Sequence, residues 1–220
     1  MKKNKIIDDY KAVIFDLDGT LVDSMWVWDK VDEEFLGKRG FAVPKDYQKT
    51  IQPMGLEKVA DYTIERFNLK DSKESVLKEW HDMAVDAYAT RVKLKPGARR
   101  YIEYLREKKV IISVATSNGI ELVEKCLKGL GIYECFHSIT TASEVSRGKG
   151  FPDIYDKSCS KMGIDKNKTI VFEDILEAIK GAKDGGYTVI AMEDEGSLGD
   201  KVNIKKISDG YIKDFREMIN

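Results

Sequence analysis

Residues 13–20 read Val-Ile-Phe-Asp-Leu-Asp-Gly-Thr, and this stretch decides the fold. Its first three residues are β-branched or aromatic, which predicts a short buried strand. Asp16 and Asp18 follow at the carboxyl end of that strand, and side chains two positions apart should point the same way. Two carboxylates so close are unfavourable unless a cation lies between them or one is protonated. The stretch therefore predicts either a functional site or an Asp-Gly turn with solvated carboxylates.

The composition is that of a soluble globular protein. The chain has 220 residues, of which 42% are hydrophobic and 34% charged, and its net charge at pH 7 is −1. This balance argues against a protein that binds nucleic acid or an anionic membrane through bulk electrostatics. No apolar run reaches the roughly 18 residues that span a bilayer, and the N-terminus shows no signal-peptide pattern. We expect a cytoplasmic protein, monomeric or weakly dimeric, without nucleic-acid or membrane partners.

The pattern of apolar residues changes along the chain. After the first strand, residues 24–91 show only amphipathic helical patterns. From residue 94 onward, helices alternate with apolar runs that are typical of buried strands, at 110–115, 138–141, 169–172, 187–191 and 210–212. Such alternation predicts an α/β fold with a parallel sheet, interrupted after its first strand by a helical insertion. We place the core at residues 1–22 and 93–220 and the insertion at residues 23–92.

Polar side chains lie at the carboxyl ends of the predicted strands, where ligands bind in open parallel sheets. Besides Asp16 and Asp18, they are Thr116, Ser117, Lys149, Glu173 and Asp174. Each alone has an ordinary explanation as a helix cap, a solvated lysine or a carboxylate near a helix N-terminus. Together, carboxylates from two strands form an oxygen-rich site suited to Mg²⁺. A lysine and a hydroxyl beside them would neutralise and orient a phosphoryl group.

In this order, the residues resemble the four motifs of the haloacid dehalogenase-like phosphatase superfamily. The matching positions are Asp16-Leu-Asp-Gly-Thr20, Thr116, Lys149 with Pro152-Asp153, and Glu173-Asp174. The helical insertion resembles the helical cap of the subfamily that includes phosphoglycolate phosphatase and β-phosphoglucomutase. The resemblance covers nearly the whole chain. It implies a Rossmann-like parallel sheet core with an inserted all-helical cap domain.

The resemblance also implies a role for each motif residue. Asp16 would be the nucleophile that forms an aspartyl-phosphate. Asp18, steadied by Thr20, would be the general acid for the leaving oxygen and then the base for water. The phosphoryl oxygens would be bound by Thr116, Ser117 and Lys149. Mg²⁺ would be held by Asp16, the backbone carbonyl of Asp18, Glu173 and Asp174.

The cap would contact the part of the substrate beyond the phosphate, because caps of such relatives close over the site. Trp28 and Lys58 are the candidates, although packing and solvation are the commoner roles of such residues. Trp28 stands about where hexose-phosphate mutases similar to this chain carry a histidine, which argues against a mutase.

The sequence thus predicts a Mg²⁺-dependent phosphatase of a small phosphorylated metabolite, with a sugar phosphate favoured. Two alternatives stay open. A phosphosugar mutase resembling β-phosphoglucomutase would use the same aspartyl-phosphate but transfer its phosphoryl group to a second sugar hydroxyl. A non-enzymatic, phospho-accepting receiver-like module also combines an aspartate, a hydroxyl, a lysine and Mg²⁺. Receivers, however, carry the acceptor on an internal strand and have no helical insertion after it.

Overall fold

The structure, a computed structural model, describes residues 9–51 and 54–219. Its centre is a six-stranded sheet in the order β5-β4-β1-β6-β7-β8, in which every pairing is parallel. The strands are β1 (Ala12–Phe15), β4 (Ile111–Thr116), β5 (Ser138–Thr141), β6 (Thr169–Glu173), β7 (Thr188–Met192) and β8 (Gly210–Ile212). All six match the strands predicted from the sequence, so the predicted α/β parallel sheet is confirmed.

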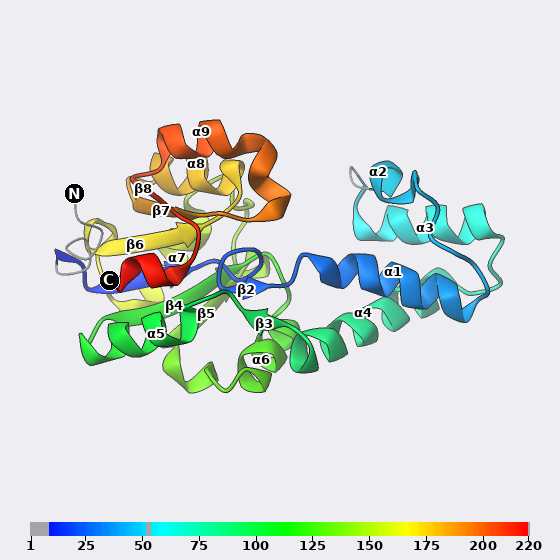
Figure 1. Cartoon of the computed structure of the whole chain (residues 1–220), viewed down its shortest axis with the longest axis horizontal. Helices are drawn as coiled ribbons and strands as arrows, with labels where there is room; N and C mark the ends of the chain where they lie inside the picture. The colour runs from blue at the N-terminus through cyan, green and yellow to red at the C-terminus, as the bar shows by residue number, and fades with distance from the viewer. Residues whose placement is uncertain (1–8, 52–53, 220) are drawn as a thin grey trace.

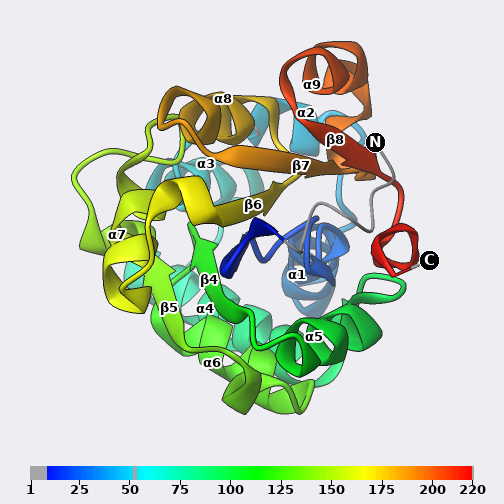
Figure 2. The same ribbon diagram turned by 90° about the vertical axis from the view of Figure 1, so that its left-hand side faces the viewer.

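Helices cover both faces of this sheet (Figure 2). One face carries α5 (Ala98–Glu107) and α6 (Ile120–Gly129), and the other carries α7 (Asp153–Met162), α8 (Leu176–Asp184) and α9 (Lys201–Ile207). Successive side chains of a strand point to opposite faces. In β1, Val13 and Phe15 therefore join the apolar cluster with α5 and α6, whereas Ala12 and Ile14 join the cluster with the other three helices. Burial on both sides explains why β1 is apolar throughout.

An aromatic cluster fixes β1 beside β6. The ring of Phe15 stacks on that of Phe172 with centroids 5.2 Å apart, and Tyr101 and Phe215 pack against both rings. The two phenylalanines are also paired in the sheet register, and the backbone N–H of Asp16 donates to the Phe172 carbonyl at 2.9 Å. This register places Asp16 next to Glu173, the following residue on β6.

Four consecutive helices form a second body beyond the carboxyl ends of the strands (Figure 1), and we call them the cap. They are α1 (Trp26–Lys38), α2 (Tyr47–Ile51), α3 (Leu56–Phe67) and α4 (Lys73–Thr90). Phe35 on α1 packs edge-on against Trp80 on α4, with ring centroids 5.3 Å apart. The side chain of Ser72 caps α4 by accepting from the backbone N–H of Ser75 at 3.2 Å. The long helix α4 also packs against α6 of the core.

The chain enters and leaves the cap through a short antiparallel pair of strands that the sequence did not predict. These are β2 (Val22–Asp23) and β3 (Lys93–Leu94). Two-residue strands carry too little periodic pattern to be recognised from sequence. The division into core and cap near residues 23 and 92 stays a prediction. No helix in the described ranges is long and apolar enough to cross a membrane.

Candidate active site

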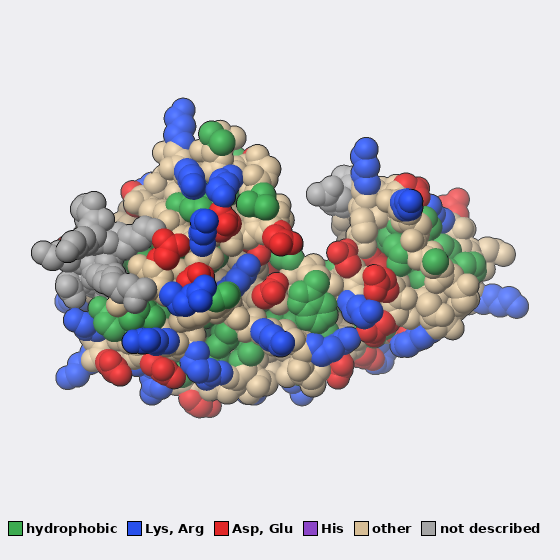
Figure 3. Space-filling view, viewed as in Figure 1, with side chains coloured by type: hydrophobic (Ala, Val, Ile, Leu, Met, Phe, Trp, Pro, Cys, Tyr) green, Lys and Arg blue, Asp and Glu red, His purple; other side chains and the backbone are tan. Residues whose placement is uncertain are grey.

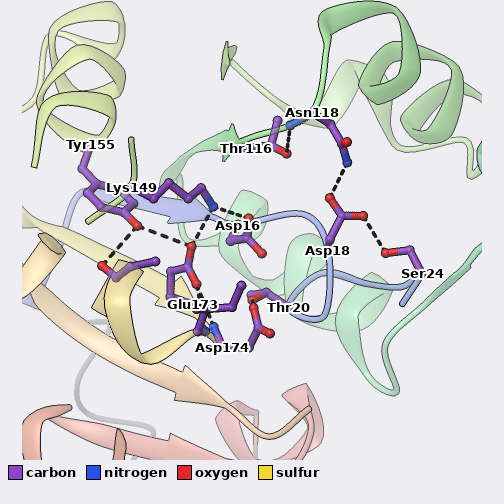
Figure 4. Close-up of polar contacts among 12 residues, drawn as sticks. Asp16, Asp18, Thr20, Ser24, Thr116, Asn118, Lys149, Tyr155, Glu173 and Asp174 are labelled. Atoms are coloured by element: carbon purple, nitrogen blue, oxygen red, sulfur yellow. Dashed lines mark hydrogen bonds and ion pairs between the residues drawn. The ribbon is translucent and has the colours of Figure 1, made fainter. Parts of the chain in front are cut away.

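The predicted site residues meet at the carboxyl ends of β1 and β6, on the side that faces the cap (Figure 1). Lys149, in the loop before α7, lies between two carboxylates (Figure 4). Its Nζ contacts Asp16 Oδ1 and lies 2.6 Å from Glu173 Oε1. Asp16 is 5% exposed, Glu173 1% and Asp174 2%. The structure thus gathers these four residues, which are far apart in the sequence, into one buried group.

A close backbone approach fixes the loop that carries Lys149. A Cβ atom on Gly181 of α8 would lie 2.2 Å from the Lys149 carbonyl oxygen and 2.7 Å from the backbone nitrogen of Phe151. Only glycine allows this contact, because real Cβ atoms do not approach backbone atoms so closely. Helix α8 therefore supports the loop from beneath and holds the lysine over the ends of the strands.

Thr20 contacts Asp174, so the prediction that it steadies Asp18 is wrong. Its Oγ1 donates to Asp174 Oδ1 at 2.9 Å. The chain turns at Gly19, which has a φ of +76°, and a Cβ there would lie 2.6 Å from Asp174 Oδ2. A side chain is disfavoured both by this left-handed backbone conformation and by the lack of space. The turn directs the Thr20 hydroxyl toward β6 and away from Asp18.

The buried group contains three carboxyl groups and one lysine. Burial raises the pKa of Asp16 although Lys149 opposes the rise. Burial also raises the pKa of Asp174, and repulsion from Glu173 and Asp16 adds to the effect. Burial disfavours the charge on Lys149, but the two carboxylates it contacts more than compensate and raise its pKa. All three carboxyl groups can therefore be ionised together only beside further positive charge, which a divalent cation would supply.

The carboxylates of Asp16, Glu173 and Asp174 are arranged so that they could hold a metal ion. Each offers an oxygen, and these oxygens lie within 4.8 Å of one another. Glu173 Oε2 is further fixed by the backbone N–H groups of Asp174, at 2.9 Å, and Ile175, at 3.2 Å. An all-oxygen donor set of three carboxyl groups fits Mg²⁺. The Asp18 side chain lies outside this set, and metal binding by its backbone carbonyl stays a prediction.

Asp18 is held by three donors from three parts of the chain. Figure 4 shows two of them, Ser24 and Asn118. Ser24 Oγ lies 2.6 Å from its Oδ1, Tyr88 Oη donates to the same oxygen, and Asn118 Nδ2 lies 2.5 Å from its Oδ2. Burial raises the pKa of Asp18, and these three donors oppose the rise. Tyr88 comes from α4 of the cap, so one donor to this carboxylate belongs to the cap. The sequence indicated Tyr88 only as a residue on the apolar side of a helix.

The two predicted phosphate-binding hydroxyls differ in their surroundings. Thr116 at the end of β4 is fully buried, and its Oγ1 accepts from the backbone N–H of Asn118 at 3.1 Å. Ser117 beside it is exposed. Thr116 therefore shapes the turn that carries Asn118 to Asp18. Phosphate binding by both hydroxyls stays a prediction.

Three further residues beside the site were not predicted. Tyr155 of α7 donates from its hydroxyl to Glu173 Oε1 at 3.4 Å. Lys95 Nζ lies 2.6 Å from Asp194 Oδ2 in an ion pair whose side chains are 13% and 3% exposed. Asp194 also borders Gly19, since a Cβ there would lie 3.2 Å from its Cγ. Tyr155 lies on the apolar face of a helix and Lys95 follows a short strand. Neither position indicates such contacts in the sequence.

Of the two predicted cap residues, one lines a pocket. The pocket has a volume of about 820 Å³, is formed by residues of the four cap helices and is bordered by Trp28. Lys58 is exposed on α3 and is not part of its lining. Asp32, on the same helix as Trp28, is 6% exposed and accepts from Gln48 Nε2 at 2.8 Å. Substrate contact by Trp28 and Lys58 stays a prediction.

We expect the Asp32→Asn variant to be more stable than wild type, and we expect this difference in stability to grow as the pH rises. Burial raises the pKa of Asp32 to about 6 against the donor Gln48, with a further contribution from Asp29. The unfolded chain has an aspartate pKa of about 3.9. The folded protein therefore loses stability as Asp32 ionises between about pH 4 and about pH 6. Urea unfolding should show the variant more stable than wild type by about 1 to 3 kcal/mol near pH 7 and about equal near pH 4.

The exposed Glu33 on the same helix provides the matched control for this prediction. Glu33→Gln should change the free energy of unfolding little at either pH, because exposed ion pairs contribute little. An equal stability difference for Asp32→Asn at both pH values would mean that ionisation of Asp32 is not the cause.

The haloacid dehalogenase-like hydrolase family matches residues 13–192, from β1 to the end of β7. This chain belongs to that family. A phosphorylated carbohydrates phosphatase of Thermotoga maritima is 26% identical over 176 residues, which cover 80% of this chain and 82% of that protein. Hexitol phosphatase B of Escherichia coli is 23% identical over 176 residues, or 78% of each chain.

Two solved structures share the whole fold. A Thermotoga maritima protein, provisionally named β-phosphoglucomutase, has a TM-score of 0.84 at 24% identity, over 95% of this chain and 97% of that one. CbbY of Rhodobacter sphaeroides with xylulose-(1,5)bisphosphate has a TM-score of 0.75 at 19% identity, over 94% and 95%. At sequence identities of 24% and 19%, the structural similarity shows a shared fold and nothing more. The predicted family and enzyme class, a phosphoric monoester hydrolase, are confirmed by the family match and the curated relatives.

Proposed function

We propose that this haloacid dehalogenase-like hydrolase is a Mg²⁺-dependent phosphatase of a small phosphorylated metabolite, most readily a sugar phosphate, and that it works through an aspartyl-phosphate on Asp16. The observation that carries the proposal is the buried group in which Lys149 lies between Asp16 and Glu173, beside Asp174. A fixed positive charge beside a buried carboxylate suits the transfer of an anionic phosphoryl group. The names of the two curated relatives, a carbohydrate-phosphate and a hexitol phosphatase, support the substrate class.

In the first step, a carboxylate oxygen of Asp16 attacks the phosphorus atom and the bond to the ester oxygen breaks. Asp18 gives its proton to that leaving oxygen. The raised pKa of Asp18, caused by burial, favours the protonated form that this step needs. Lys149 balances charge on the phosphoryl oxygens, and we assign Thr116 and Ser117 to the same oxygens.

In the second step, water attacks the phosphorus atom of the aspartyl-phosphate. Asp18, now a carboxylate, takes a proton from that water, and the bond between phosphorus and Asp16 breaks. Phosphate leaves, and both aspartates return to their starting states. One residue thus acts as acid and then as base, and the fixed donors Ser24, Tyr88 and Asn118 keep it oriented for both steps.

Asp16, Glu173 and Asp174 would hold Mg²⁺ together with the carbonyl oxygen of Asp18. When bound, the ion supplies the positive charge that allows an anionic nucleophile to approach an anionic phosphoryl group. The three carboxyl groups beside one lysine support this assignment, because burial and mutual repulsion raise the pKa of Asp16 and of Asp174 and a bound cation would oppose that rise. Without a cation, burial favours protonated Asp16, which is a poor nucleophile.

The alternatives rank lower. A phosphosugar mutase would share the aspartyl-phosphate and differ only in the group that receives the phosphoryl. A receiver-like module is disfavoured because the acceptor Asp16 follows the first strand and four helices come after it. A cytoplasmic location and a monomeric or weakly dimeric state stay predictions from the sequence.

Phosphate release from a panel of phosphate monoesters, hexose 1- and 6-phosphates included, tests the proposal. We expect release with Mg²⁺ and none after the metal is removed by a chelator. Conversion of one hexose phosphate into its isomer, without net phosphate release, would show that the enzyme is a mutase and not a phosphatase. If no ester gave either inorganic phosphate or an isomer, both the phosphatase and the mutase hypotheses would be refuted.

A further inference from the structure

The cap pocket has the size and the lining of a small-molecule site. Its volume of about 820 Å³ falls within the range of about 300–1,000 Å³ that is typical of such sites. Most of its lining is apolar, with Trp28 39% exposed and Leu56 50% exposed. The polar or charged side chains that border it are Asp29, Asp32, Gln48 and Lys49.

The pocket adjoins the rim of the active site. Met25, just before α1, belongs to its lining, and the Met25 Cε atom lies 3.5 Å from where a Cβ of Gly196 would be. The backbone N–H of Gly196 donates to Asp194 Oδ1 at 2.9 Å. Asp194 in turn borders Gly19, in the turn that follows the two catalytic aspartates. A molecule whose phosphate lies at Asp16 would therefore extend toward the pocket. Figure 3 shows the deep hollow between the core and the cap.

The charge of the pocket is negative. Asp29 and Asp32 are one helical turn apart on α1, so they share a face. Asp32 is almost fully buried, and the repulsion between the two carboxylates contributes to its raised pKa. Among the described residues of the lining Lys49 is the one cation, so the two carboxylates outnumber it; Lys49 and Asp29 are both exposed. A leaving group with a second phosphate would bring two negative charges toward two carboxylates.

An uncharged hydroxyl group suits this pocket better than a second phosphate does. Trp80 belongs to the lining and is 2% exposed, and its indole N–H has no hydrogen-bond partner among the described residues. A hydroxyl can donate to a carboxylate such as Asp32. The exposed ring of Trp28 offers an apolar surface for the carbon face of a sugar or polyol.

We propose that this pocket receives the leaving group of the substrate, and that Asp29 and Asp32 make it select uncharged, hydroxyl-bearing leaving groups over those that carry a second phosphate. The inference rests on the proposed phosphatase function and narrows its substrates. It also separates hydrolysis from mutase chemistry, because a mutase must hold a sugar bisphosphate. The fold does not impose this choice, since CbbY of the same fold was crystallised with a bisphosphate.

Matched pairs of monophosphates and bisphosphates of the same sugar test this selectivity, for example glucose 6-phosphate and glucose 1,6-bisphosphate. We expect wild type to show a kcat/KM at least about tenfold lower for the bisphosphate. The double variant Asp29→Asn/Asp32→Asn should reduce the preference for the monophosphate about tenfold. Glu33→Gln, at an exposed residue that does not line the pocket, should leave the preference unchanged. Equal or faster turnover of the bisphosphate by wild type, or a ratio unaffected by the double variant, would overturn the proposal.

Two controls separate failure of this inference from failure of the proposed function. Acetyl phosphate has a leaving group too small to reach the pocket, so every cap variant should hydrolyse it alike. If no ester is hydrolysed, Asp16→Asn protein still reports binding, because two of the three tryptophans, Trp28 and Trp80, line the pocket. Fluorescence titration should then give tighter binding of the monophosphate. Equal or tighter binding of the bisphosphate would refute the selectivity.

Discussion

Replacing Asp16 with asparagine is expected to lower kcat for phosphate release by at least about 10³-fold. An amide oxygen is a far weaker nucleophile than a carboxylate oxygen, so the aspartyl-phosphate cannot form. The fold should survive, because the register of β1 depends on backbone bonds and on the ring of Phe15. Lys149 also keeps its contact with Glu173. The measurement is phosphate release with Mg²⁺, accompanied by a thermal unfolding curve.

The exposed Asp184 on α8 is the control for this change. Asp184→Asn makes the same chemical substitution away from the buried group and should leave turnover unchanged. Turnover by Asp16→Asn within tenfold of wild type, in a folded protein, would exclude Asp16 as the nucleophile.

Replacing Lys149 with methionine is expected both to inactivate and to destabilise the enzyme. The side chain is 11% exposed and contacts Asp16 and Glu173, so its loss leaves two buried carboxylates without their cation. Removing one partner of a buried ion pair typically costs about 3 to 5 kcal/mol. Without the charge that balances the phosphoryl oxygens, kcat/KM should fall about 10²- to 10³-fold. Urea unfolding and initial rates measure the two effects.

Lys183→Met removes a lysine from a partly exposed ion pair with Asp209 and serves as the control. Lys183→Met should lower the free energy of unfolding by less than about 1 kcal/mol and leave the activity unchanged. The destabilisation of Lys149→Met should shrink when Mg²⁺ is added, because the ion would neutralise the same carboxylates. A fully active Lys149→Met enzyme would contradict the role given to this lysine.

The sequence was sufficient to predict the sheet and the buried group, because both depend on strong local patterns. The apolar run before Asp16 predicts β1, and parallel strands end at one rim, so residues that follow them converge. Asp16, Lys149, Glu173 and Asp174 were therefore predictable as neighbours. The two-residue strands β2 and β3 were not, since they hold almost no periodic pattern.

Side-chain partners were harder to predict than positions. Thr20 was expected at Asp18, but the left-handed turn at Gly19 directs it to Asp174. Tyr88 lies 70 positions from Asp18 and on another body of the fold, so only packing brings its hydroxyl there. Likewise, the burial of Asp32 depends on how α1 packs in the cap. Such contacts arise from tertiary structure, so the periodic residue pattern of a single helix or strand does not predict them.

The central claim is that Asp16 becomes phosphorylated during turnover. The most direct test mixes Asp18→Asn protein and Mg²⁺ with acetyl phosphate, whose acetate leaving group needs no proton from Asp18, stops the reaction with acid, and measures the peptide that contains Asp16 by mass spectrometry. Because the second step needs Asp18 as base, the intermediate should accumulate, and one phosphoryl group should be found on Asp16. Phosphate release by wild type, with no phosphoryl group on Asp16 at any time in either protein, would contradict the account.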